Sequence, residues 1–332
     1  MRSSPRSGPF TGCDPMKISF VIPCYRSERT LADVVAELKS TMTQRPELDY
    51  EIILTEDGSP DGVWQVIRRL AEEDPRVHAI RFTRNFGQHA ALLAGLAAVS
   101  GDAAFFLDDD GQAPVDELFK LVDELDKGYD VVYGVYPEIR QNAFRRFGTK
   151  MNKLMAETLL DWPKDLQSTS FFICRRLVVE EMLRYDKPYP YLEGLIVRAT
   201  RNIGQVLVHQ RDRAEGSSGY TLGKLLKLWL NGFTAFSVKP LRLASICGAG
   251  FAAIGFVWTL VLIIQRLIHA DIAEGWTTIV AVLLILGGLI MLMLGLIGEY
   301  IGRIYICINN SPQYVVRECL PADLLSARDR RS

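Results

Sequence analysis

Between Lys17 and Tyr136, short apolar runs alternate with longer segments whose apolar residues recur at helical spacing. The predicted strands are Ile18–Ile22, Tyr50–Thr55, Val77–Phe82, Ala103–Leu107 and Asp130–Gly134, and the predicted helices are Leu31–Thr43, Trp64–Glu73, Gln88–Val99 and Val115–Lys127. Strands that alternate with helices of about 10–15 residues indicate a mostly parallel sheet covered on both faces. We therefore predict an α/β domain whose ligand binds beyond the carboxyl ends of the strands.

Two later segments, 140–156 and 222–242, combine basic residues with apolar residues at helical spacing. An ordinary amphipathic helix with a solvated basic face would give the same pattern. Because long apolar runs follow in the chain, we favour helices that lie in the headgroup plane of a membrane.

The C-terminal third holds two uncharged apolar runs, Leu243–Ile264 and Trp276–Gly298. At ~1.5 Å per helical residue, each is long enough for the ~30 Å hydrocarbon core of a bilayer. The alternative is a pair of buried helices in a large soluble core, but such helices are usually shorter and carry polar residues at their ends. We predict a two-helix transmembrane hairpin over 243–298, followed by a cytoplasmic tail over 299–332.

Basic residues favour one side of this hairpin. Lys224, Lys227, Lys239 and Arg242 precede the hairpin, and Arg303 and Arg317 follow it, whereas the connecting loop 265–275 offers Arg266. The positive-inside bias places both termini in the cytoplasm and the protein in the inner membrane. Residues 1–15 lack the apolar core of a secretory signal and read as a disordered leader. The six cysteines form no C-x-x-C pair, as expected of reduced thiols.

Overall charge excludes some functions. The chain has 38 Lys+Arg against 39 Asp+Glu, and 48% of its residues are hydrophobic. A balanced charge with this apolar fraction is not typical of disordered or nucleic-acid-binding chains. We expect no nucleic-acid partner, and the choice between a monomer and a homo-oligomer stays open.

Acidic residues follow two of the predicted strands. Asp108, Asp109 and Asp110 come after one, and Glu56 and Asp57 after another. Such a triplet can simply be a turn or a helix cap. Adjacent carboxylates repel one another, however, so a bound cation is a natural compensation, and oxygen ligands suit Mg²⁺ or Mn²⁺. The second acidic strand end argues against a coincidence, and Asp108 and Asp110 would point to the same side of an extended chain.

Several motifs occur in a set order. They are Val21-Ile-Pro-Cys-Tyr25, Glu56-Asp-Gly-Ser-Pro-Asp61, Arg84-Asn-Phe-Gly-Gln-His89 and Asp108-Asp-Asp-Gly-Gln112, then Arg213-x-x-Gly-x-Ser-x-Tyr220, Phe236-Ser-x-Lys-Pro-Leu241 and Gly298-Glu-Tyr-Ile-Gly-Arg303. The first set resembles glycosyltransferase family 2. The later motifs and the two apolar runs narrow the resemblance to its polyprenyl-phosphate glycosyltransferases, a group that includes the dolichol-phosphate mannose synthases.

This resemblance implies a GT-A catalytic domain over 16–221 and inverting, metal-dependent transfer of a sugar. The donor would be a nucleotide sugar, with a UDP-linked one favoured, and the acceptor a polyprenyl phosphate such as undecaprenyl phosphate. The product would supply a cell-envelope glycan or a lipid A modification.

Roles follow from the matched positions. The nucleotide-binding residues would be Pro23, Tyr25, Glu56, Asp57, Arg84 and Asp109. The catalytic residues would be Asp108, Asp110 and Gln112, with Asp108 and Asp110 as metal ligands. The acceptor or phosphate-binding residues would be Arg140, Arg145, Arg213, Ser218 and Tyr220.

One departure concerns the general base. Some members carry a carboxylate where this chain has Ser168-Thr-Ser-Phe171. A lipid phosphate has a second pKa near ~6 and is largely anionic at neutral pH, so it needs positioning more than deprotonation. His89 is of a residue type that often serves as a general base, but a structural role at a helix start is the stronger interpretation.

Two other classes of protein share parts of this pattern. A processive polysaccharide synthase would usually carry Gln-x-x-Arg-Trp and more spans, whereas Gln210-Arg-Asp-Arg-Ala214 has no Trp. A non-catalytic membrane scaffold or flippase would not need carboxylates at two strand ends. Transfer in the presence of Mg²⁺ and a short polyprenyl phosphate separates these alternatives from the predicted enzyme.

Overall fold

A computed structural model describes residues 16–137, 166–188, 190–209, 211, 275–309 and 312–325, with isolated helical positions between 246 and 264. Several predicted segments lie outside the described residues: the leader 1–15, the basic helix expected over 140–156, the interfacial helix expected over 222–242, and most of the first apolar run. The chain divides into two compact units, residues 1–219 with 310–332 and residues 220–309. Each unit is described by itself.

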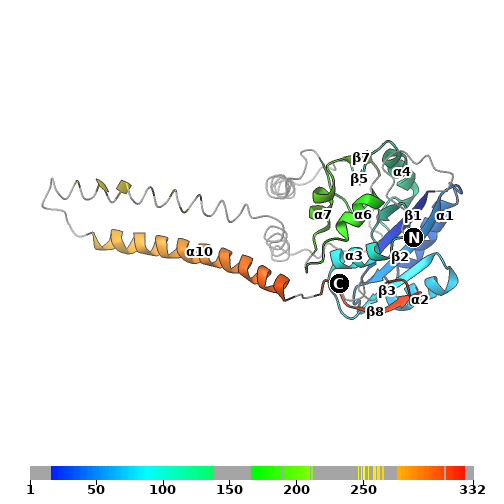
Figure 1. The fold of residues 1–332 in the computed structure, drawn as a ribbon, viewed down its shortest axis with the longest axis horizontal. Coiled ribbons are helices and arrows are strands. Elements are labelled where there is room, and N and C mark those ends of the chain that lie inside the picture. The colour runs from blue at the N-terminus through cyan, green and yellow to red at the C-terminus, as the bar shows by residue number, and fades with distance from the viewer. Residues whose placement is uncertain are drawn as a thin grey trace. The chain divides into compact units, whose positions relative to one another are not determined.

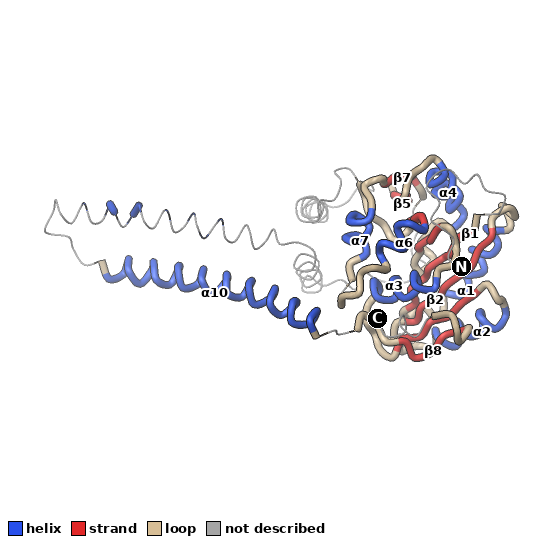
Figure 2. The backbone as a smooth tube through the Cα atoms, viewed as in Figure 1, coloured by secondary structure: helices blue, strands red, loops and turns tan. Residues whose placement is uncertain are grey.

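The first unit is built on a mixed sheet. Its strands are β1 Lys17–Cys24, β2 Asp49–Glu56, β3 Val77–Phe82, β4 Ala103–Phe106, β5 Val131–Val135, β6 Phe172–Arg175, β7 Ile203–Leu207 and β8 Val316–Leu320. Their order is β7-β5-β6-β4-β1-β2-β3-β8. The pairs β1–β2, β1–β4, β2–β3 and β5–β7 are parallel, while β4–β6, β5–β6 and β3–β8 are antiparallel. The predicted mostly parallel α/β sheet is confirmed (Figures 1 and 2).

Helices occupy the connections between the strands. They are α1 Leu31–Met42, α2 Val63–Glu73, α3 Gln88–Ala98, a 3₁₀ turn η1 Val115–Glu117, α4 Leu118–Asp126, α6 Arg176–Met182 and α7 Leu192–Ala199. The predicted helices of the N-terminal half are confirmed with small shifts at their ends. The last of them begins as the 3₁₀ turn directly after Pro114, a common way for a helix to start.

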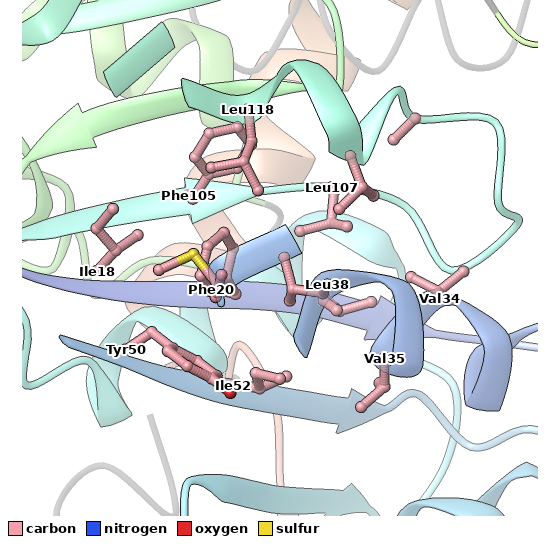
Figure 3. Close-up of a cluster of buried hydrophobic side chains, with 14 of the residues drawn as sticks. Ile18, Phe20, Val34, Val35, Leu38, Tyr50, Ile52, Phe105, Leu107 and Leu118 are labelled. Atoms are coloured by element: carbon pink, nitrogen blue, oxygen red, sulfur yellow. The ribbon is translucent and has the colours of Figure 1, made fainter. Parts of the chain in front are cut away.

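Alternation along β1 explains how both faces of the sheet are covered. Ile18, Phe20 and Ile22 point to one face and join a buried cluster with residues of α1, α2 and α4. Figure 3 shows Phe20 among Leu38, Phe105 and other labelled members of this cluster. On the opposite face Gly95 of α3 lies so close to Val21 that a Cβ would stand 2.5 Å from its side chain. The absence of a side chain lets α3 pack directly on the strands.

The strand register brings several loops to one edge. Cys24, the last residue of β1, pairs with Glu56, the last residue of β2, and Val21 pairs with Phe106 at the end of β4. Because these strands are parallel, the chain segments that follow them all leave at the carboxyl edge of the sheet. The acidic residues after β2 and β4 therefore lie at the same edge.

The second unit contains helix α10, Trp276–Ile308, with 33 residues. It begins where the second predicted span begins and continues beyond its predicted end at Gly298. Ile290, Met291 and Leu294 are 58%, 69% and 56% exposed. Within the described residues, no helix is identified as long and apolar enough to cross a membrane.

Candidate active site

The ends of β1 and β4 are joined through Asp109. Its carboxylate accepts a hydrogen bond from the backbone N–H of Tyr25 at 2.9 Å, and its carbonyl accepts one from the Thr30 hydroxyl at 2.6 Å. Asp109 therefore holds the segment after β1 against the segment after β4. Tyr25 itself is 43% exposed, whereas Pro23 before it is buried.

Asp57, directly after β2, binds the segment Arg84–Gln88, which we call the donor loop. The backbone N–H groups of Phe86 and Gly87 donate to the two Asp57 carboxylate oxygens at 2.6 and 2.9 Å, and the Asn85 side chain donates to the Asp57 carbonyl at 3.0 Å. Gly58 packs against the same loop with φ +60°, and a Cβ there would stand 2.3 Å from the Arg84 carbonyl carbon. Only glycine meets both requirements.

Glu56 faces inward and is 2% exposed. One carboxylate oxygen accepts a hydrogen bond from the Ser59 backbone N–H, and the other lies 3.4 Å from Nε of Arg81. The Ser59 hydroxyl in turn accepts from the Arg26 backbone N–H at 2.8 Å. In this structure Glu56 therefore organises the turn after β2.

Asp108 and Asp110 stand at the end of β4. The Asp108 carboxylate accepts a hydrogen bond from the Gln88 side chain at 2.9 Å, which connects it to the donor loop. Asp110 is exposed and accepts from the Gln112 backbone N–H at 3.0 Å. The chain turns at 109–110 instead of continuing extended, so Asp109 points toward Tyr25.

Three carboxylates at this edge have raised pKa values because their side chains are buried. Burial raises the pKa of Asp57 to about 6, although the two backbone N–H groups of the donor loop oppose the shift. It likewise raises the pKa of Asp109 to about 6. Burial also raises the pKa of Asp108, and the charge of Asp110 raises it further. No basic side chain of the described residues contributes to these shifts.

This donor set suits a divalent metal ion. Among the described residues, no group of three or more His, Cys, Asp or Glu side chains is arranged as a complete metal site. Mg²⁺ usually needs only one or two carboxylates, because substrate phosphates and waters complete its shell. The uncompensated pair Asp108 and Asp110 fits this incomplete type of site.

Aromatic and cationic groups are exposed nearby. The Arg26 guanidinium lies 5.4 Å from the centre of the Tyr25 ring, and the Arg84 guanidinium lies 4.2 Å from the centre of the Phe86 ring. Arg26 is also the non-glycine residue with a positive φ, +60°, among the described residues. An exposed ring suits base stacking, and exposed guanidinium groups suit phosphate oxygens.

His89 and the segment Ser168–Phe171 both bear on the question of a general base, and in the structure both have structural roles. Nδ1 of His89 accepts a hydrogen bond from the Leu192 backbone N–H at 3.4 Å, and its ring meets that of Tyr191 edge-on. The Thr169 hydroxyl donates to the Gly134 carbonyl at 2.7 Å. The predicted acceptor residues lie outside the described residues; they are Arg140, Arg145, Arg213, Ser218 and Tyr220.

Sequence reasoning missed the bridging role of the donor loop. Its motif carried the resemblance, yet only Arg84 was assigned to a site, whereas the structure shows that Phe86, Gly87 and Gln88 connect Asp57 to Asp108. Two of these contacts use backbone N–H groups, which no residue type reveals. The available signal in the sequence was Gln88, a polar side chain that follows Gly87 at the predicted start of a helix.

Family comparisons agree with this geometry. Residues 19–183 match the model of glycosyl transferase family 2, and residues 239–304 match the GtrB C-terminal hairpin. An uncharacterized glycosyltransferase of Bacillus subtilis, YkcC, is 32% identical over 91% of this chain and 94% of its own length. Two undecaprenyl-phosphate 4-deoxy-4-formamido-L-arabinose transferases are each 33% identical to this chain. The alignment with the Yersinia pestis protein covers 92% of this chain and 94% of that protein, and the alignment with the Pseudomonas fluorescens protein covers 91% of this chain and 90% of that protein.

Among solved structures, glucosyl-3-phosphoglycerate synthase of Mycobacterium tuberculosis aligns with a TM-score of 0.46 and 22% identity, covering 63% of this chain and 75% of that chain. The parallel-sheet domain and the two family matches define the class of the protein as a glycosyltransferase. The chain belongs to glycosyltransferase family 2, and its C-terminal match confirms the predicted resemblance to the polyprenyl-phosphate group.

Proposed function

We propose that the protein transfers a sugar from a nucleotide sugar to a polyprenyl phosphate, with inversion at the anomeric carbon. The observation that carries the proposal is the carboxyl edge of the sheet, where Asp108 and Asp110 stand beside the donor loop and no basic side chain of the described residues compensates the charge of Asp108. The names of the formamido-arabinose transferases support undecaprenyl phosphate as the acceptor class and lipid A or another envelope glycan as the destination.

Donor binding is assigned to this edge. The exposed ring of Tyr25 stacks on the nucleotide base, with UDP favoured, and Arg84 contacts the diphosphate. Asp108 and Asp110 would hold Mg²⁺ or Mn²⁺, which neutralises the charge of the diphosphate leaving group. Gln88 orients Asp108, and the backbone of the 110–112 turn orients Asp110.

The transfer itself is a single displacement. An oxygen of the lipid phosphate attacks the anomeric carbon while the bond from that carbon to the diphosphate oxygen breaks, and the bonding electrons leave with the nucleoside diphosphate. A phosphate that is already anionic has no proton to lose, so the reaction needs no carboxylate at Ser168–Ser170. Attack opposite to the leaving group inverts the anomeric centre.

Acceptor binding is assigned to basic residues that follow the described part of the site. Arg140, Arg145 and Arg213 would contact the lipid phosphate, because guanidinium groups bind phosphate oxygens in a bidentate fashion. Ser218 and Tyr220 would add hydroxyl donors. These assignments rest on the motif positions in the sequence.

The hairpin 243–298 is assigned to the inner membrane, with the catalytic domain and both termini in the cytoplasm. Support comes from the two uncharged runs, the GtrB hairpin match over 239–304 and the exposed apolar side chains of α10. The Lys and Arg residues outside the hairpin give the orientation. A cysteine at Ala273 should react with an impermeant thiol reagent in intact spheroplasts; labelling only after lysis would reverse the topology.

Transfer by the purified full-length protein is the direct test. The protein in detergent is incubated with Mn²⁺ or Mg²⁺, undecaprenyl phosphate and a panel of nucleotide sugars, and the lipid product is identified by mass spectrometry. We expect one glycosyl unit per lipid phosphate for at least one donor. Repeated addition of sugar would indicate a processive synthase, and an unchanged lipid with every donor would contradict the proposal.

A further inference from the structure

Near the C-terminal end of the described chain, β8 flanks β3 on the side opposite to β2, the strand that Asp57 follows. We call residues Gln313–Leu325 the C-terminal strap. Within it β8 pairs antiparallel with β3, and Phe82 pairs with Val316 (Figure 1). The Thr83 backbone N–H donates to the Val315 carbonyl at 3.0 Å. The strap therefore accompanies β3 up to the residue that precedes the donor loop.

Aromatic packing continues from the strap into the donor loop. The ring of Tyr314 stacks on that of Phe82, with centroids 5.2 Å apart and planes at 10°. Phe82 in turn meets Phe86 of the donor loop edge-on, at 5.6 Å and 83°. Tyr314 and Phe82 are 2% and 1% exposed. A contiguous row of three rings thus ends on the residue whose N–H binds Asp57.

Gln313 fixes the position of Tyr314 from the other side. Its buried side-chain amide donates to the carbonyls of Tyr185 and Lys187 at 2.8 and 2.7 Å. Tyr314 is therefore held between this anchor and the β3–β8 pairing. A side chain held at both ends can transmit a fixed position to the ring that it packs on.

The donor loop has little packing of its own. Arg84, Asn85 and Gln88 are exposed, and Phe86 is half-buried. Its described anchors are the hydrogen bonds to Asp57, the hydrogen bond from Gln88 to Asp108, and the contact of Phe86 with Phe82. Among these described anchors, the aromatic contact is the one that joins the loop to a buried apolar side chain, Phe82.

We propose that Tyr314 is a positioning residue for the nucleotide diphosphate. Its ring, acting through Phe82, holds Phe86 so that the donor loop stays bonded to Asp57 and Gln88 stays bonded to Asp108. The inference rests on the proposed function, because the ligand of the donor loop is taken to be a nucleotide sugar. The strand that follows the C-terminal hairpin in the chain is then part of the donor-binding machinery.

A purely structural strap would cover the edge of β3 and do nothing more, since sheet edges are commonly protected in this way. In that case loss of Tyr314 would lower stability without changing donor affinity. The two interpretations therefore differ in the affinity for a nucleoside diphosphate.

The experiment compares three variants of the full-length protein in detergent. Tyr314→Ala removes the ring, Tyr314→Phe keeps it, and Leu325→Ala removes a residue that is 2% exposed at the far end of the strap. UDP binding in the presence of Mn²⁺ is measured by calorimetry, next to Tm and the separate KM values for donor and lipid. GDP and dTDP replace UDP if the wild-type protein prefers them.

We expect Tyr314→Ala to raise the Kd for UDP and the donor KM by about five- to tenfold, with kcat and the lipid KM changed less than about twofold. Tyr314→Phe should restore both values to within about twofold of wild type. Leu325→Ala should lower Tm without moving the Kd. If Tyr314→Ala fails to fold, Tyr314→Leu takes its place.

An unchanged Kd in Tyr314→Ala would overturn the inference, and so would a Phe variant that behaves like the Ala variant. Failure of the proposed function gives a different result, because the wild-type protein itself would then bind no nucleoside diphosphate and form no glycolipid.

Discussion

At the amino edge of the sheet the buried carboxylate of Glu51 meets two basic side chains, whereas at the carboxyl edge the described partners of the Asp57 carboxylate are uncharged backbone N–H groups. Glu51 lies 2.8 Å from Nζ of Lys17 and 3.8 Å from Nε2 of His78. The Glu51 carboxylate also accepts a hydrogen bond from the Ser19 hydroxyl at 2.6 Å. Ser100 donates two more to it, one from its backbone N–H at 2.7 Å and one from its hydroxyl at 2.6 Å.

The pKa values move in opposite directions at the two edges. Burial alone would raise the pKa of Glu51, but its interactions with His78, Lys17, Ser100 and Ser19 outweigh burial and hold the pKa well below its usual range. Burial raises the pKa of Asp57 to about 6, and the N–H groups of the donor loop do not cancel the effect. The two residues are both 3% exposed, so the difference lies in their partners.

Charge compensation therefore separates a structural carboxylate from a binding one. Glu51 connects β1, β2 and β3 with the segment before β4, and the charge it needs is supplied within the chain. The carboxylates at the other edge leave a negative potential that a bound cation would satisfy. Residues that are poorly compensated in a cleft are candidates for function.

The largest expected effect comes from the carboxyl edge. Asp110→Asn should lower transfer by at least about a hundredfold, because it removes a ligand of the metal ion that stabilises the departing diphosphate. Tm should stay the same, since Asp110 is exposed. The matched control is Asp33→Asn in the first turn of α1, also exposed, which should leave the rate unchanged. Near wild-type transfer that still requires metal would disprove the role of Asp110.

The amino edge should show the reverse behaviour. Glu51→Gln leaves Lys17 and His78 without their buried partner and should lower the free energy of unfolding by about 3 kcal/mol. Glu72→Gln, at the exposed pair with Arg68, should cost at most about 0.5 kcal/mol. Chemical denaturation of the full-length protein measures both. Transfer per folded molecule should be unchanged in each variant, and a loss of activity without a loss of stability would place Glu51 among the functional residues.

Acidic pH should remove the contribution of Glu51 to the free energy of unfolding. Its pKa is depressed in the folded state, so its stabilisation is complete above the unfolded pKa of about 4.3 and is lost progressively as the pH falls below it. The stability difference between wild type and Glu51→Gln should therefore be largest near neutral pH and shrink between about pH 4 and pH 2. A difference that stays constant with pH would show that the carboxylate charge contributes nothing.

Ligand binding should stabilise the folded protein through the carboxyl edge of the sheet and not through the amino edge. Mn²⁺ with UDP at about a hundred times its Kd should add about 2.7 kcal/mol to the stability of the native state. The shift in Tm should disappear in Asp110→Asn and persist in Glu51→Gln. A shift of equal size in both variants would mean that UDP and Mn²⁺ bind elsewhere.

Sequence patterns predicted one part of this fold well. The strands β1 to β5 and the helices between them combine local periodicity with parallel pairing, so their positions follow from the order of apolar residues. Strands β6, β7 and β8 were missed. β6 and β7 have only four and five residues, and β8 comes after the hairpin, in a segment that reads as a polar tail. Their pairing depends on residues distant in the sequence, which no local pattern reports.

Prediction of the site had the same limit. The sequence predicted that the acidic strand ends lie at one edge of the sheet, and the parallel register confirms that placement. The local pattern did not reveal that Asp57 binds backbone N–H groups of a loop that begins after β3, or that Glu56 turns inward toward Arg81. The first depends on the path of the loop after β3, and the second on the β2–β3 register, in which Glu56 pairs with Arg81.

The smallest expected effect concerns backbone strain at the carboxyl edge. Arg26 holds a φ of +60°, which costs a non-glycine residue free energy and is retained mainly where the surroundings require it. Arg26→Gly should raise the free energy of unfolding by about 0.5 kcal/mol or less, because relief of strain is partly offset by the greater freedom of glycine in the unfolded chain. The same change removes the guanidinium beside the Tyr25 ring and should raise the donor KM by about two- to threefold. Arg29→Gly, three positions further on and also exposed, is the control for the loss of charge. Equal effects of the two substitutions on the donor KM would show that the strained conformation of Arg26 has no part in donor binding.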